Sequence, residues 1–234
     1  MEIIETGQQE TTRHATVENS KNCCGKCANK INSLNAHCGE SYSIEELLKK
    51  GNQINDFDLN HLQVDALADY IYNEYHQYYY KQEPVLSELI KNIAAHPGTN
   101  YPVIHRLKVL FSNLKNVLQA HLLVEERMLF PHLKNLVHAK RDMSSTITSG
   151  VKYLAEPVRV LQDEHKAVEE ILNEISLITN AYTPADYASE SFVLLYKKLK
   201  GLHENLKQHI FIENKIFYPK AILLEEELKE LVLL

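Results

Sequence analysis

Two stretches of the chain share a pattern of residues that suits metal binding. HLLVEERMLFP begins at His121, and HIFIENKIFYP begins at His209. In each stretch a glutamate follows the histidine by four residues; these glutamates are Glu125 and Glu213. Residues four apart lie on one face of an α-helix. Each stretch therefore predicts a histidine and a glutamate that point in the same direction.

A further histidine precedes each stretch at matched spacing. His76 lies 45 residues before His121, and His165 lies 44 residues before His209. The pattern predicts two related helical hairpins, each with one histidine on its first helix and a His-x3-Glu pair on its second. Packed face to face, the hairpins would place four imidazoles and two carboxylates around a buried cavity.

This donor set suits iron, manganese or zinc. The two glutamates alone neutralise only part of the charge of two metal ions, so an oxo or hydroxo bridge would supply the rest. The residues therefore predict a non-haem di-iron centre. A bundle without metal would bury these polar side chains without partners, which costs several kcal/mol.

A single His-x3-Glu pair is weak support for a metal site, because composition predicts about one by chance and such pairs are usually surface ion pairs. The sequence holds four, and the other two are His14/Glu18 and His165/Glu169. Only the pairs at 121 and 209 share matched neighbours. Glu169 has Tyr80 as its counterpart in the other hairpin, so we expect it to be solvated or to lie behind a ligand.

The composition favours long helices. Of 234 residues, 44% are hydrophobic, while Gly and Pro number only seven each and Trp is absent. Because Gly and Pro are the usual turn residues, their low number predicts few turns. This argues against a many-stranded sandwich or barrel. The apolar spacing predicts an all-α, up-down-up-down four-helix bundle. Pro84 and Pro131 are expected to kink or interrupt their helices. The expected helices cover about residues 61–96, 103–137, 151–180 and 186–218, followed by a short amphipathic tail helix at 221–234.

All cysteines lie in the N-terminal part of the chain, at Cys23, Cys24, Cys27 and Cys38. Clustered cysteines indicate metal binding or thiol redox chemistry rather than a disulfide framework. A flexible tail with incidental thiols is the alternative. We expect a cysteine-containing segment and linker over 1–60 and the helical bundle over 61–234.

The charge pattern limits the classes of partner. The formal net charge is −6, and the sequence shows no Lys/Arg cluster. Nucleic acid is therefore not an expected partner. Without a run of 18 apolar residues, no membrane span is expected. The N-terminus does not resemble a secretory signal, so the expected location is the cytoplasm.

At these motifs the chain resembles hemerythrin-like proteins, and more closely the di-iron family that repairs iron-sulfur clusters, the RIC group. The resemblance covers about residues 61–222. The matching segments are Tyr75-His76 followed by Pro84, His121-x3-Glu125-Glu126 followed by Leu129-Phe130-Pro131, Glu164-His165, and His209-x3-Glu213-Asn214 followed by Tyr218-Pro219.

The resemblance implies a site in a four-helix bundle with two iron ions joined by an oxo bridge. In this family two glutamates bridge the ions, and Glu125 and Glu213 match them. Histidines fill the terminal positions. A fifth histidine of the family is best matched by His96, with His105 as the alternative. The terminal ligands implied by the resemblance are His76, His96, His121, His165 and His209.

The resemblance also implies repair of clusters damaged by nitric oxide or oxidative stress, with iron-sulfur proteins as clients and with the di-iron centre supplying iron. Family members carry a Cys-Cys-Gly-Gly module. Here Cys23-Cys24-Gly25 agrees, Lys26 replaces the second glycine, and Cys27 and Cys38 are additional. These thiols form a possible second site. Family members are monomers or homodimers.

Other functions stay open at this level. One is a hemerythrin-like protein that binds or senses dioxygen or nitric oxide, and another is an enzyme that reduces nitric oxide. The sequence does not decide whether the protein is an enzyme. Glu164, beside His165, is a hypothetical carboxylate that lies behind a ligand or on an exit path for iron.

Overall fold

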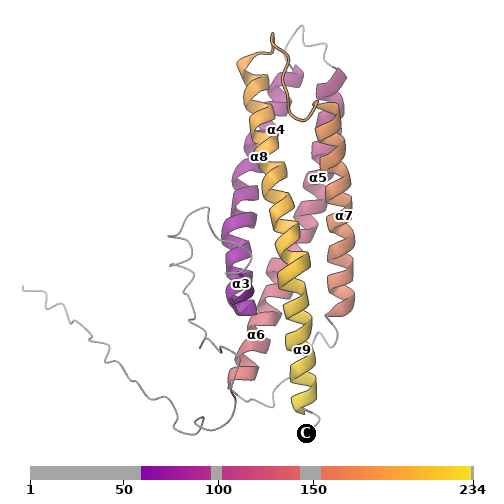
Figure 1. Cartoon of the computed structure of the whole chain (residues 1–234). Coiled ribbons are helices and arrows are strands. Elements are labelled where there is room, and N and C mark those ends of the chain that lie inside the picture. Colours follow the sequence, from indigo (N-terminus) through magenta and orange to yellow (C-terminus); the bar gives the residue numbers. More distant parts are fainter. Residues whose placement is uncertain (1–58, 96–101, 143–153, 233–234) are drawn as a thin grey trace, which may run out of the picture. The chain divides into compact units, whose positions relative to one another are not determined.

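The structure is a computed structural model that describes residues 59–95, 102–142 and 154–232. These residues form four helical rods that lie side by side and alternate in direction (Figure 1). No strand occurs within the described ranges. The predicted all-α, up-down-up-down bundle is confirmed.

Three of the rods contain a π-helical turn, written η, between two α-helices. The first rod is α3 (Val64–Ile71), η1 (Tyr72–His76) and α4 (Gln77–Ala95). The second is α5 (Pro102–Val124), η2 (Glu125–Leu129) and α6 (Phe130–Arg141). The third is α7 (Ala155–Ile178) alone, and the fourth is α8 (Glu190–Ile212), η3 (Glu213–Phe217) and α9 (Tyr218–Val232).

The rods pack as a closed ring in the upper half of Figure 1. Helix α4 contacts α5, α5 contacts α7, α7 contacts α8, and α8 returns to α4. Below this ring α6 packs against both α3 and α9. Apolar side chains fill each half, with residues such as Leu133 and Phe217 in the lower cluster and Leu107 and Leu195 in the upper one. A buried polar layer separates the two apolar clusters.

Two of the expectations about the helices need correction. Pro84 does not interrupt its helix, since α4 runs unbroken from Gln77 to Ala95. The tail helix is not a separate element, because α9 follows η3 directly and continues to Val232. Pro219 lies in the first turn of α9, where a missing backbone N–H is tolerated.

The connection between α7 and α8 is longer than the four-residue turn expected from the sequence. Helix α7 ends at Ile178 and α8 begins at Glu190. Three consecutive residues there have left-handed backbone angles, with φ of 49° at Asn180, 52° at Ala181 and 61° at Tyr182. Left-handed geometry disfavours continuation of a right-handed helix, so it ends α7.

The start of α7 is fixed by a carboxylate from the fourth rod. The backbone N–H of Leu154 donates to both oxygens of Glu225, at 3.2 and 3.1 Å. Glu225 is buried and also accepts from Lys229 at 2.8 Å. A negative charge at a helix N-terminus satisfies free N–H groups and interacts favourably with the helix dipole.

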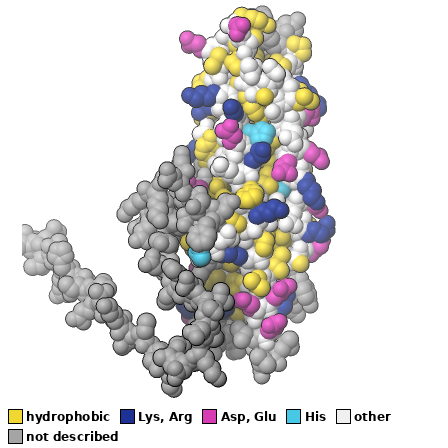
Figure 2. Space-filling model, in the orientation of Figure 1, with side chains coloured by type: hydrophobic (Ala, Val, Ile, Leu, Met, Phe, Trp, Pro, Cys, Tyr) yellow, Lys and Arg dark blue, Asp and Glu magenta, His cyan; other side chains and the backbone are white. Residues whose placement is uncertain are grey.

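The outer surface carries both signs of charge. On the face shown in Figure 2, Lys and Arg side chains are interspersed with Asp and Glu. Among the described residues, no helix is long and apolar enough to cross a bilayer.

Candidate metal centre

Six of the predicted ligand residues meet in the polar layer between the two apolar clusters. Each is at most 3% exposed. All three rods with π-turns and α7 contribute at least one of them. They are His76 at the end of η1, His121 in α5, Glu125 at the start of η2, His165 in α7, His209 in α8 and Glu213 at the start of η3.

Their ligand atoms fall into two groups, each compact enough for one ion. One group contains four residues and is called position A: His76, Glu125, His209 and Glu213. The other, called position B, contains His121, His165 and Glu213. Within each group the ligand atoms lie within 4.8 Å of one another. Glu213 belongs to both groups, as expected of a bridging carboxylate.

The two oxygens of Glu213 face different positions. Oε1 lies 2.7 Å from His209 Nε2 in position A. Oε2 lies 3.0 Å from His165 Nε2 in position B. Glu125 is placed differently, because its Oε2 lies 3.3 Å from His76 Nε2 and 3.4 Å from His121 Nε2. A single oxygen of Glu125 therefore lies between the two positions.

Several of the inward-facing atoms lack hydrogen bonds. Within the described residues, His76 Nε2, Glu125 Oε2 and Glu213 Oε2 are buried and have no hydrogen-bond partner. Leaving a buried polar atom unpaired costs about 1–3 kcal/mol, and more for a charged group. Cations bound between these atoms would satisfy all three. The donor set of imidazole nitrogens and carboxylate oxygens thus fits the metal ions that the sequence predicts.

Three histidines are oriented by a second contact behind the cluster. His76 Nδ1 pairs with Glu126 Oε1 at 2.9 Å, and Glu126 also accepts from the Tyr80 hydroxyl at 2.8 Å. On the other hairpin, His165 Nδ1 pairs with Asn214 Oδ1 at 3.1 Å. Because Nδ1 is engaged outward, Nε2 is the nitrogen that faces the cavity.

His121 has the third such contact. Its Nδ1 lies 2.9 Å from Glu164 Oε2, and the Glu164 side chain is 31% exposed. Glu164 directly precedes His165 in the sequence, but its carboxylate pairs with the histidine of the facing helix. Glu169, one turn further along α7, is exposed and contacts no cluster residue that the structure describes.

The electrostatics show what the cluster does without metal. Burial disfavours the charged form of His76, but contacts with Glu125 and Glu126 outweigh it and raise the His76 pKa to about 9. The same balance, with Glu125 and Glu164, raises the pKa of His121 well above its usual range. Burial alone would raise the pKa of Glu213, yet its histidine neighbours hold it well below its ordinary value. Without metal, His76 and His121 therefore take up protons beside the buried glutamates.

The π-turns set the directions of three ligands. In each, one backbone N–H bonds five residues back instead of four: Gln77 to Tyr72, Phe130 to Glu125, and Tyr218 to Glu213. Such turns insert one residue into a helix and occur mostly at functional sites.

Two of the three turns are followed by a proline, Pro131 or Pro219. Proline cannot donate to the carbonyl four residues back, so the regular ladder is already broken at these points. Near η1 no proline plays this part, because Pro84 lies eight residues beyond His76 and inside α4.

Aromatic rings enclose the ligands. Tyr75 stacks on His209 with ring centroids 5.2 Å apart, and Phe130 lies 5.5 Å from His76. Tyr218 stacks on His165 at 5.8 Å, and its hydroxyl donates to Glu125 Oε1 at 2.8 Å. The rings keep water away from the polar layer, and Tyr218 also contacts a candidate ligand directly.

Sequence reasoning did not assign roles to Glu126, Asn214 or Tyr218. The repeat held a usable signal for the first two, because both follow the repeated glutamate directly. In both hairpins the polar side chain at that position is long enough to contact the histidine on the neighbouring helix. Tyr218 corresponds to Phe130, and that difference of one hydroxyl was the available signal.

The remaining predicted site residues are not part of the described cluster. His96, Cys23, Cys24 and Cys27 lie outside the described residues. His105 is exposed on α5, and it lies sixteen residues before His121, about 24 Å along a helix. His105 is therefore not the fifth ligand.

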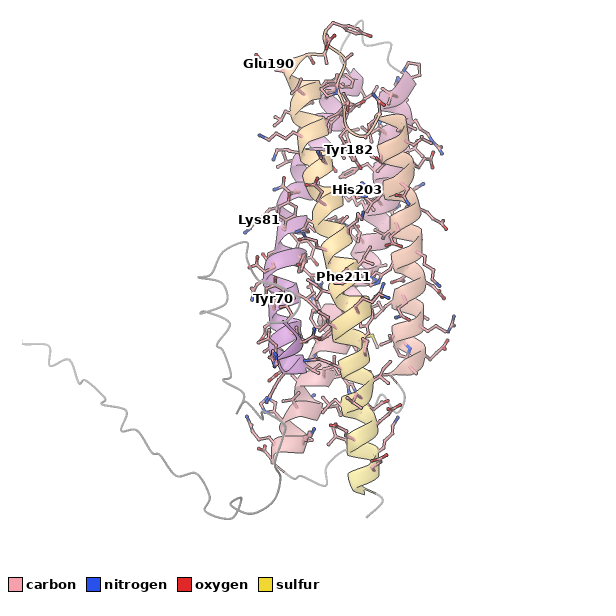
Figure 3. All side chains as sticks on the ribbon, viewed as in Figure 1. Tyr70, Lys81, Tyr182, Glu190, His203 and Phe211 are labelled. Atoms are coloured by element: carbon pink, nitrogen blue, oxygen red, sulfur yellow. The ribbon has the colours of Figure 1, made fainter. Side chains whose placement is uncertain are left out.

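His203, six residues before His209 in the sequence, is not part of the cluster and pairs with Tyr182. The Tyr182 hydroxyl and His203 Nδ1 are 2.6 Å apart. Figure 3 shows both residues in the upper half of the bundle. This pair joins the α7–α8 connection to α8.

Comparison with known proteins agrees with this geometry. The iron-sulfur cluster repair protein ScdA of Staphylococcus haemolyticus is 23% identical over 203 residues, covering 85% of this chain and 86% of that protein. The iron-sulfur cluster repair protein YtfE of Edwardsiella ictaluri is 26% identical and covers 86% of each chain. YtfE of Escherichia coli O81 is 27% identical over 177 residues, 76% of this chain and 74% of that one.

The family comparison is the most direct. The hemerythrin HHE cation binding domain matches residues 56–221, which contain every residue of the buried His/Glu cluster. This match covers more than half of the chain. The chain therefore belongs to the hemerythrin family of cation-binding domains.

Proposed function

We propose that this protein repairs iron-sulfur clusters damaged by nitric oxide or oxidants, and that it does so by supplying iron held between its four rods. The observation that carries the proposal is the buried cluster of four histidines and two glutamates with unpaired inward-facing atoms. The relatives that match most of the chain are iron-sulfur cluster repair proteins, which supports the same activity.

The arrangement supports two ions rather than one. Positions A and B each offer at least three ligand atoms, and Glu213 turns one oxygen toward each. Two carboxylates neutralise only part of the charge of two divalent or trivalent ions. We therefore propose two iron ions with an exogenous oxo bridge. Such a centre would take up or give up iron as the charge of the ions changes.

The chain's own residues hold, orient and shield this centre. His76, His121 and His165 present Nε2 because Nδ1 is bonded behind them. The apolar clusters above and below exclude water, which strengthens each ion–ligand interaction. The six described ligands suffice for this proposal, which does not depend on His96. The Cys23/Cys24/Cys27 segment is a proposed thiol site that would assist transfer to a client.

The test follows labelled iron into a client. The protein is loaded with ⁵⁷Fe(II) without oxygen and mixed with an iron-sulfur enzyme whose cluster was destroyed by nitric oxide, in the presence of thiol and sulfide. We expect ⁵⁷Fe in the rebuilt cluster, seen by Mössbauer spectroscopy, and recovery of the client's activity. The Glu125→Ala/Glu213→Ala double variant, loaded in the same way, should give neither.

Other outcomes identify the competing functions. Equal recovery with the double variant contradicts the proposal. Reversible dioxygen binding without any transfer of ⁵⁷Fe would identify a carrier or sensor. Nitrous oxide formed over many turnovers would identify a nitric oxide reductase.

A further inference from the structure

The two hairpins of the bundle are related by sequence, but the cluster they form is not symmetric. Position A draws on both glutamates, whereas position B draws on Glu213 alone among the carboxylates. The difference begins at Glu125. Its Oε2 faces the cavity, and its Oε1 accepts a hydrogen bond from Tyr218.

The hydroxyl that makes this bond has no counterpart in the other hairpin. Tyr218 and Phe130 occupy the same place in the repeat, one residue before proline. Phe130 has a ring but no hydroxyl, so it cannot hold an oxygen of Glu213 in the same way. Both oxygens of Glu213 accordingly face the cluster's histidines, at 2.7 Å from His209 and 3.0 Å from His165.

The residue that holds this oxygen packs against a ligand of position B. The Tyr218 ring is stacked on His165, a residue of position B, with an interplanar angle of 12°. Its hydroxyl reaches Glu125 Oε1 at 2.8 Å. Tyr218 is fully buried, so water does not compete for this bond. Only Oε2 of Glu125 therefore remains for metal, and Glu125 belongs to the ligand group of position A but not to that of position B.

We infer that Tyr218 is a positioning residue that restricts Glu125 to one oxygen and thereby makes position B bind its ion more weakly than position A. The inference rests on the proposed function and deepens it. In a protein that hands iron to a client, the ion at the weaker position leaves first. The iron supplied for repair is thus the one beside His121 and His165.

Stepwise affinities test this directly. The metal-free chain is titrated with ferrous iron in the absence of oxygen, in competition with a chelator, so that two dissociation constants are obtained. Wild type should show two separate steps. In Tyr218→Phe, the weaker step should tighten about tenfold, the size of effect typical of residues that support a ligand. The tighter step should stay within about twofold, which shows that the fold is intact.

The sign of the change separates positioning from a structural role. A residue that only supports the fold would weaken one or both steps when it is altered, whereas Tyr218→Phe is expected to strengthen one. Tyr79→Phe is the matched control. Tyr79 is 2% exposed and lies on α4, three residues beyond His76, and its hydroxyl has no hydrogen-bond partner among the described residues. This variant should show both wild-type constants.

Two further readouts do not depend on repair activity. Mössbauer spectra of ⁵⁷Fe-loaded wild type should show two different iron environments, and these should converge in Tyr218→Phe. Release of the first iron to a chelator should also slow about tenfold in this variant. A Tyr218→Phe protein with unchanged or weaker steps overturns the inference and leaves the proposed function standing. A wild-type chain that binds fewer than two ions overturns both.

Discussion

At the scale of single residues, the two nitrogens of each ring have different partners. For His76, His121 and His165, Nδ1 meets a polar side chain at the rim of the layer, while Nε2 faces inward. This arrangement fixes the tautomer and the ring orientation before any ion binds. The residues that contact Nδ1 of these histidines therefore contribute to the affinity for metal, as the ligands do.

Glu164 provides a test of that idea. Glu164→Leu removes the carboxylate that holds His121 Nδ1. We expect the affinity for ferrous iron to fall by about 10- to 100-fold, because His121 loses its orientation. Chelator competition measures this change.

Glu169→Leu is the control for the Glu164 variant, since Glu169 is exposed on the same helix and should leave the affinity unchanged. An exit path for iron, the role suggested from sequence, predicts instead slower release with unchanged affinity. That result would contradict the orienting role.

The histidines also predict how metal-free protein responds to pH. The His76 pKa is raised to about 9 by its contacts with Glu125 and Glu126, which outweigh its burial. Between pH 6.5 and 9 the folded chain keeps a proton that the unfolded chain has released. The free energy of unfolding should therefore fall as pH rises through this window, by up to about 3 kcal/mol from His76.

Urea unfolding of metal-free protein at pH 6.5, 7.5 and 9 measures the slope. The raised pKa of His121 acts in the same direction. The lowered pKa of His209 acts weakly in the opposite direction near pH 6.5, where the unfolded residue is still partly protonated, and has no effect at higher pH. His76→Gln should flatten the dependence. Stability that is constant or rises toward pH 9 in wild type would contradict the assignment.

At the scale of elements, the π-turns place the ligands. Glu125 and Glu213 are the first residues of η2 and η3, and His76 is the last residue of η1. A π-turn absorbs one extra residue, so the helices before and after it keep their own registers. The ligand at the turn is thus directed independently of the packing above and below.

Deletion of Met128 tests the role of η2. Met128 is 60% exposed, so its side chain contributes little to the core. The deletion should convert η2 to an ordinary α-turn and leave α5 and α6 in register. We expect native helical content by circular dichroism but clearly reduced iron content, since Glu125 and Glu126 are redirected.

Deletion of Asn135, exposed within α6, is the comparison for the Met128 variant. No π-turn is available there to absorb the change, so it rotates the rest of α6 by about 100° and should lower the unfolding temperature. Wild-type iron content after deletion of Met128 would show that η2 does not set the site.

At this scale the sequence predicts some features and conceals others. Four long apolar patterns with short connections predict the rods, and the repeat predicts which four histidines and two glutamates meet. The π-turns were not predicted, because a five-residue turn has the same composition as a turn of α-helix. Pro219 therefore suggested a helix end, whereas η3 allows the rod to continue to Val232.

At the scale of the whole molecule, the bundle is two apolar cores with one polar layer between them. Residues of the lower core, such as Leu129 and Phe217, lie directly below the layer, and residues of the upper core, such as Leu122 and Ile210, lie directly above it. Burying six ionisable side chains is costly unless they are paired with charges of opposite sign. At this level of the described bundle, bound cations would offset that cost.

The helix pattern specified the position of this layer, but not its asymmetry. Spacing fixes which residues share a level, since it depends only on residues per turn. The choice of Glu125 oxygen by Tyr218 depends on side-chain directions across three rods, which spacing does not contain. His96 and the cysteines lie outside the described residues, so their roles stay predictions.

Iron per chain is the measurement that tests the central claim most directly. The metal-free chain is loaded with ferrous iron without oxygen, desalted and analysed for metal. Wild type should retain about two irons, one for each group of His and Glu donors. Glu213→Ala should retain fewer than about one, because Glu213 belongs to both positions. His105→Ala, an exposed histidine on α5, should match wild type.

A variant with all four cysteines changed to serine decides between the two candidate sites. Retention of about two irons in that variant is expected if the bundle holds the metal. Iron that persists in Glu213→Ala and disappears with the cysteines would contradict the metal centre described above.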